Sequence, residues 1–143
     1  MVFSSFWWKK ITSSTKVTIA KDHFLYARWK PKKPSTVKIT VKAVSGNGVR
    51  IYWKEAKAVE GYTIYRATSK NGTYKRIKDV YKGSESWTDE DAEYAYDFDT
   101  DKVSFKDVSL KAGKTYYYKV AAFRNNNGKK KYGDKSKAVS IKL

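Results

Sequence analysis

The feature that most constrains the fold is a series of short segments in which apolar and polar residues alternate, each bounded by turn residues. Glycine, asparagine and serine mark the turns, at residues 45–48, 69–72, 111–113 and 125–128. No segment shows a convincing helical period. The alternation predicts seven short strands, at residues 37–43, 48–54, 61–67, 73–80, 103–108, 115–123 and 137–143. We therefore expect an all-β, seven-stranded immunoglobulin-like sandwich.

The segment 115–123 contains three consecutive tyrosines, which must alternate between the two faces of a strand. We expect Tyr116 and Tyr118 to face the core and Tyr117 to face outward. By the same alternation Tyr52 and Tyr65 face outward, where they would form a tyrosine cluster with Tyr117. The pattern over all strands predicts a structural core of Val49, Ile51, Trp53, Tyr62, Ile64, Leu110, Tyr116, Tyr118 and Val120.

Composition limits the chemistry that the chain can perform. The 143 residues include no cysteine and one histidine, His23, which excludes disulfides, thiolate metal sites and cysteine nucleophiles. No two carboxylates can be assigned as an acid and base pair. We expect neither enzymatic activity nor a cofactor. The longest uncharged N-terminal stretch, residues 1–8, is too short for a signal peptide or a membrane-spanning helix, so we expect no membrane span.

Charge is distributed unevenly along the sequence. The net charge is +17, and residues 85–101 contribute −8, so the remainder of the chain carries +25. A field of this strength attracts polyanions of any kind, although a lysine-rich surface also serves solubility alone. Lysine-rich segments beside tyrosines are also typical of single-strand nucleic-acid binders, but stacking needs both residue types on one face, and we regard nucleic acid as a less favoured partner.

The acidic segment carries two further candidate sites. Alternation in YAYDFDTD predicts an extra edge strand or hairpin, with aromatic residues on one side and carboxylates on the other. A calcium loop of the helix-loop-helix type is excluded by Lys102 and Val108, and a looser calcium site would use Asp89, Asp91, Asp97 and Asp99. A ligand platform for sugar rings would use Trp87, Tyr94 and Tyr96.

Residues 36–143 resemble a fibronectin type III domain, in particular the branch found in bacterial surface proteins. The resemblance lies in VRIYW at 49–53, GYTIYR at 61–66, YRATSKNGTYKRI at 65–77 and LKAGKTYYYKVAAF at 110–123. It implies that Tyr116 forms a tyrosine corner, in which the hydroxyl binds the preceding backbone. Two departures are Ala112, where the family usually has proline, and a long acidic insertion at residues 81–102.

The N-terminal residues resemble a different family. KKITSSTKVTIAKDHFLYARWKP, at residues 9–31, is similar to the closing half of an internalin B-type, β-grasp-like repeat, through residues 12–18 and through Leu25, Tyr26, Ala27 and Trp29. We therefore divide the chain into a partial repeat at 1–30, a linker at 31–35 and the fibronectin-like domain at 36–143. Unpaired strand edges in half a repeat would have to pack on the sandwich or on a second chain, which would give a dimer.

These resemblances imply a non-catalytic interaction or spacer module of a secreted or cell-wall-attached bacterial protein. Modules of both kinds present adhesive or catalytic neighbours on cell surfaces, and their partners are proteins or wall polymers. Function inferred from a fold is analogy, so two alternatives remain. One is a carbohydrate-binding accessory domain that uses the aromatic residues of the acidic insertion. The other is a polyanion or nucleic-acid binder that acts through the basic surface.

Overall fold

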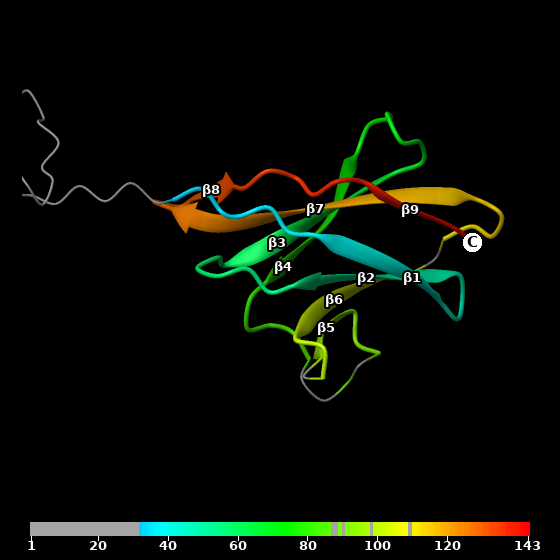
Figure 1. The fold of residues 1–143 in the computed structure, drawn as a ribbon, viewed down its shortest axis with the longest axis horizontal. Coiled ribbons are helices and arrows are strands. Elements are labelled where there is room, and N and C mark those ends of the chain that lie inside the picture. The colour runs from blue at the N-terminus through cyan, green and yellow to red at the C-terminus, as the bar shows by residue number, and fades with distance from the viewer. Residues whose placement is uncertain (1–31, 87–88, 90, 98, 109) are drawn as a thin grey trace, which may run out of the picture. The chain divides into compact units, whose positions relative to one another are not determined.

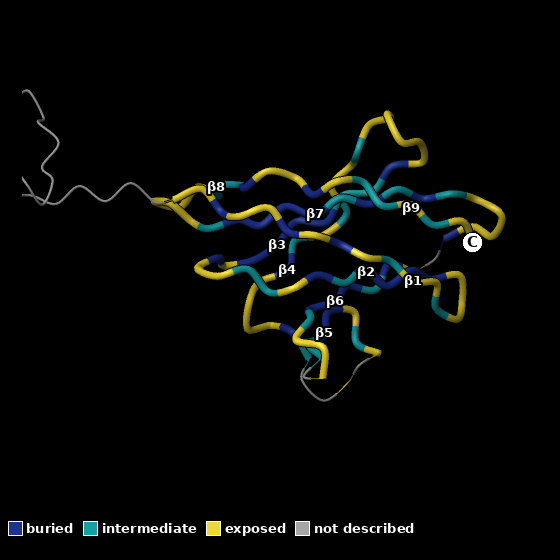
Figure 2. The backbone as a smooth tube through the Cα atoms, in the orientation of Figure 1, coloured by how far each residue is buried: buried dark blue, intermediate teal, exposed yellow. Residues whose placement is uncertain are grey.

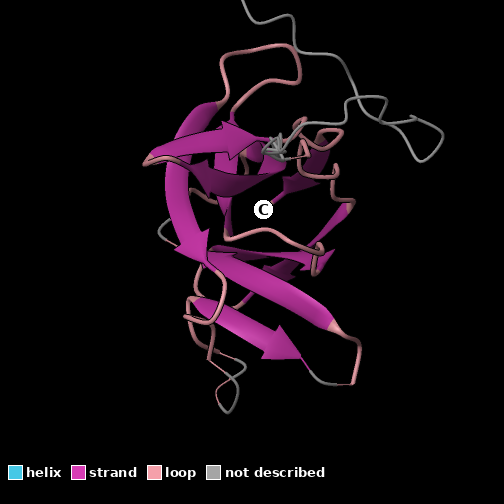
Figure 3. Ribbon diagram, turned by 90° about the vertical axis from the view of Figure 1, so that its left-hand side faces the viewer, coloured by secondary structure: helices cyan, strands magenta, loops and turns pink. Residues whose placement is uncertain are grey.

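The computed structural model describes residues 32–143, except 87, 88, 90, 98 and 109 (Figure 1). The predicted N-terminal half-repeat, with its extra β segment, lies outside the described residues. None of the described residues lies in a helix, so this part of the chain offers no helix that could span a membrane. Figure 3, which shows the molecule turned by 90°, contains strands and loops alone.

Nine strands form two sheets in the described part of the chain. The first sheet has the order β1-β2-β6-β5, and the second has the order β4-β3-β7-β8 with β9 also paired to β7. All of these strand pairs are antiparallel. The bounds are β1 Ile39–Val44, β2 Gly48–Lys54, β3 Gly61–Ala67, β4 Lys75–Tyr81, β5 Tyr94–Asp97, β6 Lys102–Asp107, β7 Thr115–Asn126, β8 Lys129–Tyr132 and β9 Val139–Lys142.

The predicted fold class is therefore confirmed, with two strands beyond the predicted seven. β5 is the extra edge strand that the alternation in the acidic insertion indicates, and it pairs with β6. β8 is not among the seven strands that alternation predicts, although it follows directly on the turn predicted at NNNG, residues 125–128. In the structure Asn127 and Gly128 both have positive φ, at 52° and 80°, as a two-residue hairpin of the primed type requires, and β7 continues through this turn into β8.

The core lies between the two sheets. Figure 2 shows buried backbone along β2, β3, β6 and β7, whereas most of the connecting loops are exposed. The largest fully buried side chains include Trp53, Tyr62 and Tyr118. The inward-facing residues of both sheets form this core, and some outward-facing residues, such as Arg50 on β2 and Thr63 on β3, are buried as well because other segments cover them.

Part of the predicted linker is packed against the sandwich. Pro34 is buried, and the Lys33 ammonium lies 2.6 Å from the Asp134 carboxylate. A Cβ at Gly133 would lie 2.5 Å from the Pro34 carbonyl oxygen, so glycine permits this close approach. Residues 33 and 34 therefore pack on the sandwich, although they fall within the linker that the sequence predicts at 31–35.

Candidate interaction surfaces

All nine residues of the predicted core lie in the interior, each with at most 6 % of its surface exposed. They thus contribute packing rather than a binding surface. Tyr116 also has the hydrogen bond of a tyrosine corner, because its hydroxyl accepts from the Lys111 backbone N–H at 2.9 Å. The turn between them contains Gly113, which has a φ of +74° that few other residues adopt.

An aromatic cluster fills the interior beside β5. The Trp53 ring lies 5.1 Å from the Tyr62 ring and is stacked on the Tyr94 ring at 6.5 Å, measured between centroids. Burial raises the pKa of Tyr62 to about 12 and raises that of Tyr94 further above its ordinary range. Tyr94 is 7 % exposed, so its ring cannot be the open stacking surface that the predicted platform needs.

The second platform residue, Tyr96, is also partly covered. Tyr96 is half-buried on β5, and its hydroxyl donates to the Asp101 carboxylate, a hydrogen bond that raises the pKa of Tyr96 to about 12. Trp87 lies outside the described residues. The prediction was wrong for Tyr94 because alternation on β5 points Tyr94 and Tyr96 into the sandwich rather than to solvent.

The four aspartates proposed as calcium ligands do not converge on one point, and two of them accept hydrogen bonds within their own turns. The Asp97 carboxylate accepts from the Asp99 backbone N–H at 2.9 Å and from Thr100, and Asp89 accepts from the Asp91 backbone N–H at 2.9 Å. These are turn-closing hydrogen bonds of a kind that aspartate commonly makes. Among the described residues, no three histidine, cysteine, aspartate or glutamate side chains are grouped to hold a metal ion.

The acidic insertion instead covers the outer face of the first sheet. The Arg50 guanidinium, on the outer side of β2, donates to the Ser104 hydroxyl at 3.0 Å and to the Ala92 carbonyl at 3.1 Å. Arg50 is 4 % exposed. A buried guanidinium needs acceptors for its five N–H groups, and one of these acceptors is a backbone carbonyl of the insertion. This part of the insertion therefore has a packing role.

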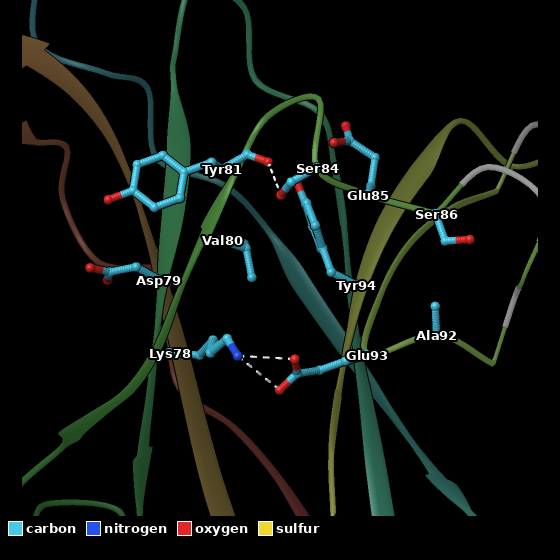
Figure 4. Close-up of a pocket in the computed structure, with 10 residues that line it drawn as sticks. All are labelled: Lys78, Asp79, Val80, Tyr81, Ser84, Glu85, Ser86, Ala92, Glu93 and Tyr94. Carbon is cyan, nitrogen blue, oxygen red and sulfur yellow. Dashed lines mark hydrogen bonds and ion pairs between the residues drawn. The ribbon is translucent and has the colours of Figure 1, made fainter.

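A cleft of about 370 Å³ separates the edges of the two sheets, between β4 and the start of β5 (Figure 4). The Lys78 ammonium crosses it and contacts the Glu93 carboxylate at 3.0 Å. Glu85, in the cleft wall, is 6 % exposed. One Glu85 carboxylate oxygen and the Tyr94 hydroxyl are buried without a hydrogen-bond partner among the described residues. The lining is thus acidic in a chain that is otherwise strongly basic.

The outer face of the second sheet has two parts, one covered by side chains from other segments and one open to solvent. In the first part, Phe123 is completely buried although it points away from the core. Its ring contacts those of Tyr81 and Tyr132 edge to face, at 5.4 and 5.9 Å between centroids, and the Lys130 ammonium lies 4.5 Å above it. Gly61 lies opposite Phe123 in the ladder. A Cβ on Gly61 would lie 2.6 Å from the Phe123 ring, so glycine is required there.

A polar pair completes this covered part. The Asp79 carboxylate accepts from the Thr63 hydroxyl at 2.6 Å and from the Lys130 ammonium. Burial alone would raise the pKa of Asp79, but the hydrogen bonds from Lys130 and Thr63 outweigh burial and hold the pKa below its ordinary value. We use the name covered patch for these residues together: Thr63, Asp79, Ala121 and Phe123, which are covered, and Tyr81, Lys130 and Tyr132, which cover them.

The second part of this outer face is open, and we call it the tyrosine–lysine face. Tyr65 lies opposite Lys119 in the β3–β7 ladder, and Tyr117 lies opposite Ser140 in the β7–β9 ladder. Ammonium groups lie over two rings: Lys119 is 4.3 Å from the Tyr74 centroid and Lys135 is 4.3 Å from that of Tyr65. The face consists of Tyr65, Tyr74, Arg76, Tyr117, Lys119, Lys135 and Lys142.

The predicted tyrosine cluster is correct in part. Tyr65 and Tyr117 share the outer face of the second sheet, as their alternation indicates. Tyr52, however, lies on β2 in the first sheet, where the Lys42 ammonium is 5.9 Å from its ring. Alternation gives the direction of a side chain relative to its own sheet, but it does not say which of the two sheets contains the strand.

Strand order now identifies the architecture. Strands β1, β2, β6 and β5 form one layer and β4, β3, β7, β8 and β9 form the other, with a tyrosine corner at the start of β7. The fold is fibronectin type III-like. No protein-family model and no curated protein matches the sequence. Solved structures do match, 31 chains in all.

One of these matching structures is described as an Fn3-like protein from Clostridium thermocellum. It is 21 % identical in sequence, with a TM-score of 0.45, and the match covers 74 % of this chain and 88 % of that one. Fibronectin type III-like domains are typically non-catalytic and are common in extracellular proteins.

Sequence reasoning missed the covered patch. The inward alternation of β7 explains Tyr116, Tyr118 and Val120, but Phe123 has the outward parity and is completely buried. A signal was present in NNNG, because a primed turn after an alternating strand predicts a partner strand that can cover the end of β7. A second signal was Gly61 at the start of an otherwise bulky strand.

Proposed function

We propose that the chain is a non-catalytic interaction or spacer module of a secreted or cell-wall-attached bacterial protein, which presents adhesive or catalytic neighbours. Its fibronectin type III-like fold supports this proposal. So does the resemblance of residues 9–31 to an internalin B-type repeat, since modules of this kind are strung together on bacterial surfaces. The proposal includes the division of the chain into residues 1–30, 31–35 and 36–143.

The observation that carries the proposal is the position of the two ends of the sandwich. Residues 33 and 34 lie beside Asp134 and Gly133, and the Gly133 N–H donates to the Ala122 carbonyl near the end of β7. Leu143, at the other end, exchanges backbone hydrogen bonds with Gly113 and Lys114, just before β7 begins. The two points are eight residues apart along β7, which corresponds to about 27 Å.

Neighbouring domains joined to the two ends of such a sandwich would lie on opposite sides of it. If both ends lay on one side, the neighbouring domains would instead lie close to each other. The arrangement therefore suits a spacer that separates its neighbours from the surface to which they are attached. It requires neither a pocket nor a catalytic group.

Location of the protein in cells tests the proposal directly. Antibodies raised against the 143-residue chain should detect the protein in the culture medium or in the wall fraction. Protease added to intact cells should remove the wall-attached protein. Detection in the cytosol alone would contradict the proposal. Such a result would favour an intracellular partner for the basic surface.

The carbohydrate alternative is tested by titration of the chain with a panel of neutral glycans at about 150 mM salt, where electrostatic attraction is screened beyond roughly 8 Å. We expect no micromolar binding. Micromolar binding that disappears in Trp87→Ala, but persists in Tyr52→Ala on the first sheet, would replace the spacer proposal with a carbohydrate-binding module.

A further inference from the structure

The tyrosine–lysine face has a surplus of positive charge that the described structure does not balance. Lys119, Lys135 and Lys142 form no ion pair with a described carboxylate; the ammonium groups of the first two lie over tyrosine rings. The fourth cation, Arg76, lies 3.5 Å from Asp79, which already accepts from Lys130. Unpaired cations grouped on one face raise the local concentration of anions near it.

The carboxylates of the chain are concentrated elsewhere. Eight of its 14 acidic residues lie in the segment 85–101, which belongs to the first sheet and its edge. Of the others, Asp107 is paired with Arg66, Asp134 with Lys33 and Glu55 with Lys82. The described part of the chain is thus polarised, with an acidic edge at β5 and a basic face whose cations come from β4, β7, β9 and the segment before β9.

The cations are spread over the face at a spacing that suits a long anion. Arg76 lies opposite Tyr65, and Tyr65 opposite Lys119, so the two cations are two strand spacings apart, or about 10 Å. Lys142 lies opposite Thr115, four residues before Lys119 on the neighbouring strand, which gives about 14 Å between the two backbones. The backbones of these three cations thus span about 10 to 14 Å of the face, and a linear polymer that crosses the strands would meet the cations in succession.

The aromatic rings of the face favour a polymer without bases. Stacking of nucleic-acid bases needs open ring faces on the same surface as the charge. Here the ammonium groups of Lys119 and Lys135 lie 4.3 Å from the ring centroids of Tyr74 and Tyr65. These contacts hold the lysine side chains in place over the sheet, which lowers the entropy lost when a phosphate binds them.

We propose that the tyrosine–lysine face binds a linear polyol phosphate, the class of polymer that forms the anionic backbone of teichoic acids. Phosphates would contact Lys119, Lys135, Lys142 and Arg76, and the tyrosine rings would position the lysines. The inference goes beyond the proposed function, because a spacer needs no such surface. Cell fractionation tests the location of the protein, and a binding titration tests this face, so each proposal can fail without the other.

The test is a titration of the 143-residue chain with poly(glycerol phosphate) at salt concentrations from about 50 to 200 mM. The variant Lys119→Gln/Lys135→Gln/Lys142→Gln removes three cations from the proposed site. Its matched control is Lys42→Gln/Lys54→Gln/Lys106→Gln, which removes three cations from strands β1, β2 and β6 of the first sheet. Both variants carry the same net charge, so any difference between them reports the site rather than the total field.

We expect the first variant to lose roughly tenfold or more in affinity at 150 mM salt and to show a shallower dependence of log affinity on log salt, by about 2, as three lost contacts require. The control should lose about twofold or less. Equal losses in the two variants would overturn the proposal in favour of diffuse attraction. Absence of binding at 50 mM salt would also overturn it. So would a higher affinity for an oligothymidine with the same number of phosphates, if the substitution Tyr117→Ala weakened the binding of that oligothymidine. Urea denaturation of each variant checks that it is folded.

Discussion

Side chains on the outer face of β7 differ in exposure between the two ends of the strand. Tyr117 and Lys119, near its start, are half-buried side chains on the open tyrosine–lysine face. Ala121 and Phe123, near its end, point to the same side of the sheet and yet are almost completely buried, at 1 % and 0 % exposed. The backbone pairing with β3 is continuous through both halves, so the difference does not come from the strand itself.

Cover from elsewhere in the chain explains the difference. β8 pairs with the end of β7, and the segment after it follows the same edge, where Gly133 bonds Ala122 and Ser136 bonds both backbone groups of Val120. Lys130 and Tyr132 of β8 then close over Phe123. Near the start of β7 the neighbouring strand is β9, which presents Ser140 and Lys142 to this outer face, while its apolar residues Val139 and Ile141 pack against the core. The direction of a side chain is therefore a local property, whereas its burial depends on distant segments.

The largest expected effect of a substitution on this face is that of Phe123→Ala. The ring is completely buried between Tyr81 and Tyr132, so its removal should leave a cavity under Lys130 and lower the free energy of unfolding by about 3–5 kcal/mol. Urea denaturation of the full chain measures this loss. A loss below about 1 kcal/mol would mean that the covered patch is merely a loose layer over the sheet, in which case the two ends of β7 would not differ energetically.

Alkaline pH should reveal buried tyrosines that ionise only when the interior opens, although burial also raises the pKa values of Tyr65 and Tyr74 on the tyrosine–lysine face. Burial raises the pKa of Tyr62 to about 12, and burial also raises the pKa values of Tyr94 and Tyr118. An unfolded tyrosine titrates near 10, so the folded state binds more protons above that pH. Stability from these groups is complete below pH 10 and is lost as pH rises from 10 through the folded pKa, at about 1.4 kcal/mol per unit for Tyr62.

Absorbance of tyrosinate, recorded together with circular dichroism, measures this effect. A fraction of the 12 tyrosines should ionise only when the chain unfolds. Tyr62→Phe should shift the midpoint of alkaline unfolding to higher pH, because one group that must ionise on unfolding has been removed. If all tyrosines ionised in a single step before the structure was lost, the interior hydroxyls would have to be accessible to solvent.

The same contrast between direction and burial shows how much of the fold could be read from the sequence. The bounds of β2 and β3 are those that alternation predicts, and the inward residues of β7 were predicted and are buried. β8 and the covered patch were missed because Phe123 is buried by residues of β8, which lie beyond the turn at the end of β7. The stacking platform failed at Tyr94 for a related reason, since nothing local in YAYD shows that its aromatic side faces Trp53.

A smaller effect is expected from the polar pair of the covered patch. Lys130→Met should remove one hydrogen bond and one charge partner from Asp79 while it keeps the aliphatic cover of Phe123, and should cost about 1–2 kcal/mol at neutral pH. Asp79 has a lowered pKa, so its contribution is present above the unfolded value near 4 and is lost as pH falls through the folded pKa. In the variant this acid dependence should be weaker. Lys129→Met, an equal charge change at an exposed neighbour, is the control and should be nearly neutral.

The smallest effect is expected for Tyr117→Ala, at the open end of β7. Tyr117 points away from the core between Ala67 and Ser140 on the neighbouring strands, so its truncation should remove only cross-strand packing and cost about 1 kcal/mol or less. Denaturation of this variant beside Phe123→Ala compares two aromatic residues of the same strand, the same face and the same parity. Equal losses would show that some part of the chain covers both ends of β7. A loss at Tyr117 that exceeded the loss at Phe123 would place Tyr117 in the core and shift the register of β7 by one residue, which would reverse the direction of every side chain on the strand.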